Sequence, residues 1–212
     1  MKIKYCPNCR SVLPLGNYSY WENKPQTTDE KEILHFLIKS KILKKNILHI
    51  GIGNSEIALK LSEYNNIIGI TISKPEILSA KKKLIKNYKT YLINKYSNKL
   101  NLLKKYKFDI VIDINLKSYS CCKKAFEKMF STLSSLLNKN GFLITNKKGM
   151  NWSCMLKPKL TFTIKRFGKR ILKEENGPKT NKFTIQECKI LAKKNNLRLI
   201  QKKKTNIVLF KK

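Results

Sequence analysis

The stretch 46–72 constrains the fold of this chain more than any other part of the sequence. Residues 46–50 have the composition of a short buried strand, and residues 51–55, Gly-Ile-Gly-Asn-Ser, form a glycine-rich turn after it. Residues 56–61 then place apolar side chains at helical spacing, and residues 66–72 are a second apolar run. A strand, a glycine turn, a helix and another strand open a nucleotide-binding α/β unit, in which glycine lets the backbone approach a ligand without a Cβ in the way.

This stretch resembles motif I of the class I S-adenosylmethionine-dependent methyltransferases, an apolar strand that often ends in an acidic residue and precedes Gly-x-Gly-x-Gly. Gly51 and Gly53 match the first two glycines. Ser55 stands at the third, and His49 stands where the acidic residue is usual. A dinucleotide-binding Rossmann domain would need its third glycine one residue later, where Glu56 would oppose a pyrophosphate. We therefore expect a ligand with no phosphate near the turn, such as S-adenosylmethionine; a structural turn without a ligand is the alternative.

The composition is that of a globular protein with one α/β domain and a small appendage. The chain has 212 residues, of which 42% are hydrophobic. No apolar run approaches the roughly 20 residues that cross a bilayer, and the N-terminus lacks the apolar core of a secretion signal. We therefore expect a cytoplasmic protein without a membrane span, whose six cysteines are reduced thiols.

The formal net charge of +33 predicts attraction to anionic partners at low salt. Only four of the 46 basic residues are arginines, which are better than lysines at bidentate contacts with phosphates and guanine edges. Lysine, asparagine and isoleucine are frequent in predicted helices and loops alike, as an AT-rich coding bias would produce. The charge therefore does not establish nucleic acid as the substrate.

Residues 1–28 form an N-terminal extension that is predicted to be irregular, because it contains scattered proline and glycine. Cys6 and Cys9 have the spacing of half a zinc knuckle, but a structural zinc needs four ligands. The other cysteines are dispersed and include the pair 121–122, so we favour a metal-free knuckle over a zinc site. Residues 18–22 contain three aromatic side chains, which either pack against the core or, by analogy with methyltransferases, cover a cofactor as a lid.

Thr27 and Glu30 are spaced as a capping box, which predicts the start of a helix that runs to about Lys44. This helix begins the main domain, residues 29–212. A second helix is predicted around Pro75 in its first turn, with Ile77, Leu78 and Leu84 turned toward the core.

Residues 69–73, Gly-Ile-Thr-Ile-Ser, end the second strand of the glycine-turn unit. In most class I methyltransferases an acidic residue near this point holds both ribose hydroxyls of the cofactor. Thr71 and Ile72 stand there instead, and a hydroxyl does not make the charge-assisted pair of hydrogen bonds that a carboxylate makes. We therefore expect weaker cofactor binding, unless Glu76 or another acid substitutes. A short third strand is predicted at 91–93; Tyr96 follows it, where members of the family often contact adenine.

Residues 108–113 form a fourth strand that resembles motif IV of the same family, Phe-Asp-x-(Ile/Val)-(Ile/Val). In open parallel sheets the ligand crevice lies beyond the carboxyl ends of the strands, where the strand order reverses. Asp113, Asn115 and Lys117 follow this strand, and we expect them to orient or deprotonate the acceptor. The segment is not the (Asp/Asn)-Pro-Pro-(Tyr/Phe) motif of amino-methylating DNA enzymes, which argues against base amino groups as the acceptor.

The rest of the chain completes the order of elements that the resemblance implies. A long helix capped by Ser118 or Ser120 is predicted to run to about Leu137 and to end at Asn140-Gly141, followed by a fifth strand at 142–145. Residues 146–182 are a long basic connection with aromatic side chains, which in this family is the acceptor side. Two strands at 197–200 and 207–210 follow a last helix. We therefore expect a doubly wound α/β fold with a mostly parallel seven-stranded sheet and a C-terminal antiparallel hairpin.

The function that the resemblance implies is methyl transfer from S-adenosylmethionine to a small-molecule or glycan-type, anionic acceptor. One alternative is an RNA methyltransferase that uses the basic connection. Another is a methyltransferase-like module that binds cofactor weakly and acts through a partner. The expected cofactor-binding residues are His49, Gly51, Gly53, Asn54, Ser55, Thr71, Ile72, Tyr96 and Asp113. The expected catalytic residues are Asp113, Asn115 and Lys117, and the candidate metal ligands are Cys6 and Cys9.

Overall fold

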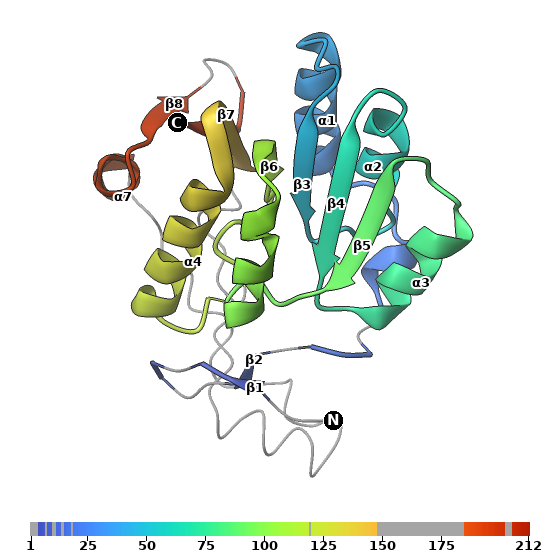
Figure 1. Cartoon of the computed structure of the whole chain (residues 1–212), viewed down its shortest axis with the longest axis horizontal. Coiled ribbons are helices and arrows are strands. Elements are labelled where there is room, and N and C mark those ends of the chain that lie inside the picture. The colour runs from blue at the N-terminus through green and yellow to red at the C-terminus, as the bar shows by residue number, and fades with distance from the viewer. Residues whose placement is uncertain are drawn as a thin grey trace.

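A seven-stranded sheet forms the centre of the molecule (Figure 1). The computed structural model describes residues 4–6, 8–9, 12–13, 15–17, 19–118, 120–147, 185–201 and 205–212. The strand order in the sheet is β5-β4-β3-β6-β7-β9-β8. The strands are β3 (Asn46–Ile50), β4 (Asn66–Thr71), β5 (Tyr88–Leu92), β6 (Phe108–Ile112), β7 (Leu137–Asn146), β8 (Arg198–Gln201) and β9 (Ile207–Lys211).

The strand pairing confirms the expected fold class. Strands β3 to β7 pair in parallel, and β9 runs antiparallel to both β7 and β8. The strand order reverses between β3 and β6, which pair through Ile47↔Ile110, Leu48↔Val111 and His49↔Ile112. A crevice at the carboxyl ends of these two strands is therefore the place where this fold binds ligands.

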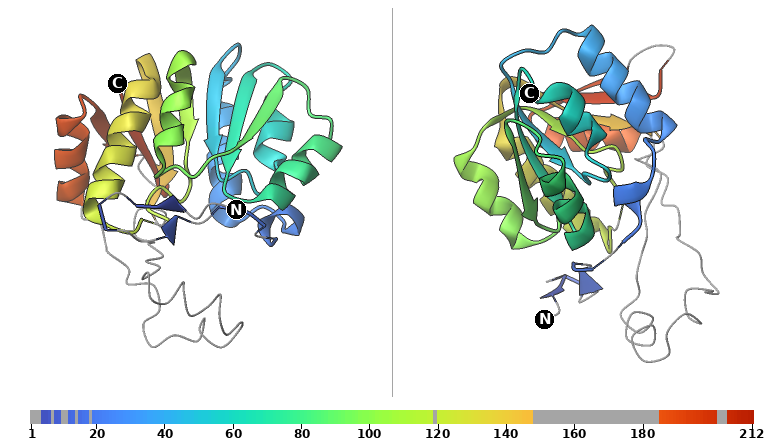
Figure 2. Two further views of the ribbon diagram at one scale, coloured as in Figure 1. Left: turned by 60° about the horizontal axis from the view of Figure 1, so that its bottom comes forward. Right: turned by 90° about the vertical axis from the view of Figure 1, so that its right-hand side faces the viewer.

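Helices cover both faces of the sheet (Figure 2). On one face, α1 (Thr28–Lys39) and α2 (Glu56–Leu61) pack against the sheet through Ile33, Leu37 and Ile57. On the other face, α4 (Lys123–Leu136) and α7 (Ile185–Lys194) bury Phe130 and Leu191, next to the 3-10 helix η2 (Asn98–Lys105). Both faces of the central strands are thus removed from water, which explains why these strands are continuous apolar runs.

Helix α3 (Lys74–Lys82) buries a different face from the one that the sequence predicts. Glu76 and Ala80 are its buried residues, whereas Leu78 is 60% and Leu84 is 88% exposed. Ser73 caps the helix by accepting a hydrogen bond from the Glu76 backbone N–H at 3.3 Å. The cap fixes the helix so that positions 76 and 80, one turn apart, point inward, and it brings a carboxylate to the end of β4.

Several element boundaries also differ from the sequence predictions. Helix α1 ends at Lys39 and not near Lys44, because the chain turns through Ser40 into the left-handed conformation of Lys41 (φ 47°). Strand β5 begins at Tyr88, before the predicted start. Gly141 lies inside β7 and not at a helix C-cap, beside a register shift in the β6–β7 ladder. Helix α4 begins after Cys122, which is its N-cap.

The N-terminal extension contains more regular structure than the sequence predicts. Strands β1 (Lys4–Tyr5) and β2 (Val12–Leu13) form a small antiparallel hairpin beyond the carboxyl ends of the parallel strands (Figure 1). Gly16 then docks on the end of β4: its N–H donates to the Ile72 carbonyl at 2.8 Å, and its carbonyl accepts from the Lys74 N–H at 2.8 Å. The 3-10 helix η1 (Trp21–Asn23) follows.

The hairpin brings Cys6 and Cys9 to the cysteine pair that precedes α4. The Sγ atoms of Cys6, Cys9, Cys121 and Cys122 all lie within 4.8 Å of one another. The sequence analysis treated these cysteines as dispersed, because they lie far apart along the chain, and on this point it was wrong.

Two further expectations concern the chain as a whole. The predicted basic connection 146–182 lies outside the described residues except for Asn146 and Lys147. Among the helices that the structure does describe, none has the length and the apolar character to cross a bilayer.

Candidate functional site

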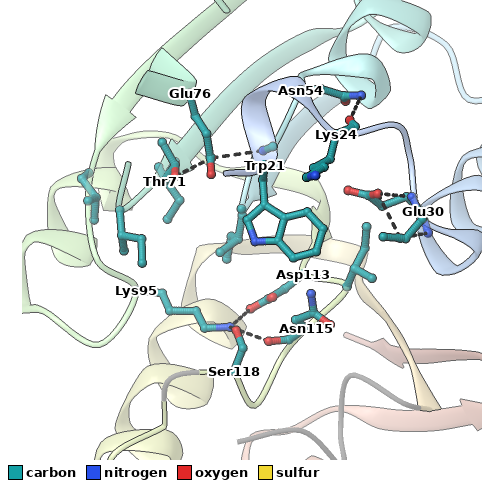
Figure 3. Close-up of a pocket in the computed structure, with 18 of the residues that line it drawn as sticks. Trp21, Lys24, Glu30, Asn54, Thr71, Glu76, Lys95, Asp113, Asn115 and Ser118 are labelled. Atoms are coloured by element: carbon teal, nitrogen blue, oxygen red, sulfur yellow. Dashed lines mark hydrogen bonds and ion pairs between the residues drawn. The ribbon is translucent and has the colours of Figure 1, made fainter. Parts of the chain in front are cut away.

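A cavity of about 150 Å³ lies at the carboxyl ends of β3, β4 and β6 (Figure 3). Its floor comes from the ends of these strands, at Ile50-Gly51, at 70–72 and at 113–115. Its outer wall comes from the N-terminal extension and the start of α1, through Trp21 and Glu30. The cavity therefore sits at the point where the strand order reverses.

The glycine turn adopts a backbone that glycine favours at each position of its Gly-x-Gly-x-Ser pattern. Gly51, Gly53 and Ser55 have φ angles of 76°, 50° and 64°. The position that a Cβ of Gly51 would occupy has no heavy atom within 4 Å, so this glycine faces open space at the cavity. Ser55 adopts a left-handed backbone conformation, which costs a non-glycine residue roughly 1–2 kcal/mol. The backbone therefore has a positive φ angle at all three positions, including the serine.

Glu76 supplies the carboxylate that the end of β4 lacks. Its Oε2 accepts a hydrogen bond from the Thr71 hydroxyl at 2.6 Å and another from the Gly53 N–H at 3.1 Å. Among the described residues, no donor contacts its second oxygen, Oε1, and the residue lines the cavity. Burial raises the pKa of Glu76, and the hydrogen bonds from Thr71 and Gly53 oppose that rise.

Asp113 lies in a buried ion pair with Lys95, a residue that the sequence analysis did not single out. The Lys95 ammonium donates to Asp113 Oδ2 at 2.8 Å and to the Asn115 and Leu116 carbonyls, each at 2.9 Å. All three donors of the ammonium are therefore used. Burial raises the pKa of Asp113 and lowers that of Lys95, while the attraction between the two charges opposes both shifts.

The N-terminal extension closes the cavity from outside. In Figure 3 the Trp21 indole projects across the cavity, between the Glu76 and Asp113 side chains in that view. Asn54 holds the extension in place, because its side-chain amide donates to the Lys24 carbonyl at 2.7 Å. The extension is thus joined directly to the glycine turn.

The structure brings most of the expected site residues to the cavity. Asn115 and Asn54 line it, as do Gly51, Gly53, Thr71, Ile72 and Asp113. Four expected residues do not line it: His49, Ser55, Tyr96 and Lys117. Tyr96 is buried, and its hydroxyl donates to the Ser118 carbonyl at 2.8 Å, so it holds the loop after β6. Lys117 is also buried; burial lowers its pKa, and Glu187 and Cys188 of α7 oppose that shift.

His49 lies in the middle of the sheet, beside Gly69 of β4 and Ile112 of β6. Its side chain is 1% exposed, and neither ring nitrogen has a hydrogen-bond partner among the described residues. Burial lowers its pKa from 6.5 to about 4, so the imidazole is neutral at physiological pH.

The charge around the cavity contrasts with the charge of the chain. The protein has 13 acidic residues against 46 basic ones. Three acids, Glu30, Glu76 and Asp113, nevertheless line the cavity, against two lysines, Lys24 and Lys95. The described lining therefore holds more acidic than basic side chains, and one of the two lysines, Lys95, is paired with Asp113.

Solved structures identify the fold as that of class I S-adenosylmethionine-dependent methyltransferases. The N-methyltransferase NodS from Bradyrhizobium japonicum WM9 matches with a TM-score of 0.55 at 14% identity, over 88% of this chain and 97% of that chain. Magnesium protoporphyrin IX methyltransferase (ChlM) from Synechocystis PCC 6803, with bound SAM, matches with a TM-score of 0.56 at 13% identity, over 90% of this chain and 86% of that chain. A SAM-dependent methyltransferase from Methanosarcina mazei matches with a TM-score of 0.54 at 16% identity, over 83% and 96% of the two chains. No protein-family model and no curated protein sequence matches the chain.

Proposed function

We propose that the protein is a methyltransferase that binds S-adenosylmethionine in the cavity at the ends of β3, β4 and β6. The observation that carries the proposal is the position of this cavity. It lies at the strand-order reversal of a methyltransferase fold, between a glycine turn with positive φ angles and a buried carboxylate. When bound, the cofactor supplies a methyl group on a sulfonium that is already activated for displacement.

The residues around the cavity suit the parts of this cofactor. Gly51 leaves open space into which a methionine chain fits, with Asn54 beside it. Thr71 and Glu76 together take the place of the single acid that usually holds the ribose, with Glu76 Oε1 available as the acceptor. The apolar side chains Ile72 and Ile93 provide a wall for the adenine.

The chain's own contribution to the reaction is alignment of the acceptor against the methyl group. Asn115 is exposed at the cavity, and its side chain is placed to orient an acceptor. The Asp113 side chain lines the same cavity, and its ion pair with the Lys95 ammonium fixes it in position. An oxygen acceptor must also lose a proton, and we assign this role to Asp113, because its carboxyl group lines the cavity.

We further propose a small-molecule acceptor and a movable outer wall. The cavity volume is below the roughly 300–1,000 Å³ of typical small-molecule pockets, so cofactor and acceptor require Trp21 and Lys24 to move outward. Once Trp21 and Lys24 have moved outward, a small acceptor has room beside them, next to the bound cofactor. This movement also makes η1 a lid, as residues 18–22 suggested.

Isothermal titration calorimetry with S-adenosylmethionine tests the proposal. We expect saturable binding by the wild-type protein. Gly51→Val should abolish binding, because its side chain fills the space that the glycine leaves open. Glu76→Gln should weaken binding by about tenfold or more, the loss of one charge-assisted hydrogen bond. Glu63→Gln, an exposed glutamate on the surface, is the matched control and should bind as wild type.

Two further measurements complete the test. A Trp152→Phe variant leaves Trp21 as the sole tryptophan, and its fluorescence should change on cofactor binding if η1 is a lid. A folded wild-type protein that gives no heat at millimolar cofactor would overturn the enzyme proposal and favour the partner-module alternative. Binding of cofactor with methyl transfer to RNA, and to no small molecule, would favour the RNA alternative.

A further inference from the structure

The cysteine cluster is a second site, formed by residues that do not line the cavity. Two of its members, Cys6 and Cys9, come from the β1–β2 hairpin, and two, Cys121 and Cys122, from the loop between β6 and α4. The four Sγ atoms lie within 4.8 Å of one another, and those of Cys6 and Cys122 are 4.0 Å apart. In a tetrahedral site with Zn–S bonds of about 2.3 Å, the sulfurs are about 3.8 Å apart. Small side-chain shifts therefore bring these sulfurs to coordination distance.

We propose that Cys6, Cys9, Cys121 and Cys122 bind one structural Zn²⁺ ion, which fastens the N-terminal hairpin to the β6–α4 loop. Four thiolates in a tetrahedral arrangement select zinc over the oxygen-binding cations Mg²⁺ and Ca²⁺. The four sulfurs fill the coordination shell and leave no open position, which is the arrangement of a structural zinc site.

The chemistry of the step is coordination without electron transfer. Each of the four thiols gives up its S–H proton to solvent as its sulfur binds, so one Zn²⁺ replaces four protons. The product carries a net charge of two minus, because four thiolates surround one divalent cation. The exposed lysines Lys123 and Lys124 follow directly after Cys122 and offset this charge.

The start of α4 holds the Cys122 sulfur in position, while burial raises the pKa of its thiol. This residue is the N-cap of α4, a helix of 14 residues, and its Sγ accepts a hydrogen bond from the Ala125 N–H at 3.4 Å. The positive end of the helix dipole stabilises negative charge on a sulfur in this position.

The two segments that the metal joins also form opposite sides of the cavity. The β6–α4 loop begins with Asp113 and Asn115, and it runs through Ser118 to the cysteine pair. The hairpin continues through Gly16, which docks on Ile72. A metal at this junction is therefore a positioning element: it fixes the outer wall and the loop relative to each other and takes no part in methyl transfer.

Metal analysis of the full-length protein, without cofactor, tests this inference. We expect one Zn²⁺ per chain by mass spectrometry of the metal. Co²⁺ substitution should give the intense visible bands of a tetrahedral thiolate site. Cys6→Ser and Cys122→Ser should each lower zinc affinity by at least about tenfold and abolish those bands. Cys188→Ser is the matched control, because Cys188 is as buried as Cys6, at 1% exposure, and lies outside the cluster.

A second measurement keeps the inference testable if the serine variants do not fold. Removal of zinc from the wild-type protein by a chelator should lower its thermal midpoint, and added Zn²⁺ should restore it. The inference is overturned if the reduced, folded protein takes up no zinc and its four thiols are alkylated at the same rate with and without the ion. A disulfide among the four cysteines in freshly isolated protein, seen by intact mass, would overturn it as well. Because none of these readouts uses S-adenosylmethionine, they do not depend on the proposed methyltransferase function.

Discussion

Two buried ionisable centres lie on or next to neighbouring strands of the sheet, and only one of them has hydrogen-bond partners among the described residues. At the carboxyl end of β6, Asp113 meets Lys95, whose ammonium has three good acceptors. In the middle of β3, His49 is equally buried, but its ring has no hydrogen-bond partner in the described part of the chain. The pair with partners lines the cavity, and the isolated imidazole does not.

The two centres differ in how their burial is compensated: the ion pair has hydrogen-bond partners, and the imidazole has none among the described residues. The Lys95–Asp113 pair costs desolvation, which its close geometry offsets, and it holds the loop on which Asn115 stands. The His49 imidazole is tolerated because it can shed its proton and become neutral. Breaking the pair should therefore be costly, whereas replacing the histidine should be favourable.

The largest effect is expected from Lys95→Met, which leaves the Asp113 carboxylate buried without its partner. We expect a loss of about 3–5 kcal/mol in the free energy of unfolding at neutral pH, measured by urea denaturation. Lys128→Met, at an exposed lysine, is the control and should change stability little. The double variant Lys95→Met/Asp113→Leu should lose clearly less than the single variant. Equal losses would show that the pair is not coupled as the geometry indicates.

The next effect concerns pH and His49. In the unfolded chain this histidine titrates near 6.5, and in the folded protein burial lowers its pKa to about 4. Between these two pH values the unfolded chain binds more protons than the folded protein does. The free energy of unfolding is therefore unaffected by His49 above pH 6.5, and it falls by about 3 kcal/mol in total as the pH is lowered toward 4. His49→Leu should remove this part of the acid destabilisation, as measured by thermal unfolding from pH 7 to pH 4.

His35 provides the matched control for that measurement. It is the other of the two histidines in the chain, and it is exposed on α1. His35→Gln should follow the pH dependence of the wild type. If His49→Leu follows it as well, the imidazole has a partner in solution and the contrast with Lys95 fails.

A smaller effect is expected at the third buried centre, Glu76. Thr71→Val keeps the shape of the side chain but removes the hydroxyl that donates to Glu76 Oε2 at 2.6 Å. We expect a loss of about 1.5–3 kcal/mol in stability. The pKa of Glu76 should rise further, so that cofactor affinity falls earlier as the pH is lowered. Thr132→Val, which removes a hydroxyl bonded to the Lys128 carbonyl on the surface, should leave both properties close to wild type.

The fold was largely readable from the sequence, because its signals are local. The glycine turn after β3, the apolar runs of β4 and β6, and the closing hairpin each depend on neighbours along the chain. The expected seven-stranded order follows once these elements are placed in the methyltransferase pattern. Helix α3 was the failure: its leucines suggested one inward face, whereas the Ser73 cap and the fit against β4 selected the face with Glu76.

The candidate site was readable in part for the same reason. Residues at the end of a strand or directly after it, such as Thr71, Gly51 and Asp113, reach the cavity because the carboxyl ends of parallel strands meet at one edge. Lys95 gave no signal, because its partner Asp113 follows a different strand and lysine is frequent throughout the chain. Tyr96 and Lys117 were assigned to the site from their position along the chain, but both side chains are buried elsewhere and do not line the cavity.

By itself the sequence determined the strands of the central sheet to within a few residues, the glycine turn and the order of these elements, since periodicity and turn chemistry act over a few residues. It did not predict the small β1–β2 hairpin. Only the tertiary structure decided which side chains meet across long separations. It paired Lys95 with Asp113, and it brought Cys6 and Cys9 to Cys121 and Cys122. These contacts depend on how packed helices and loops direct side chains in space, which no local pattern specifies.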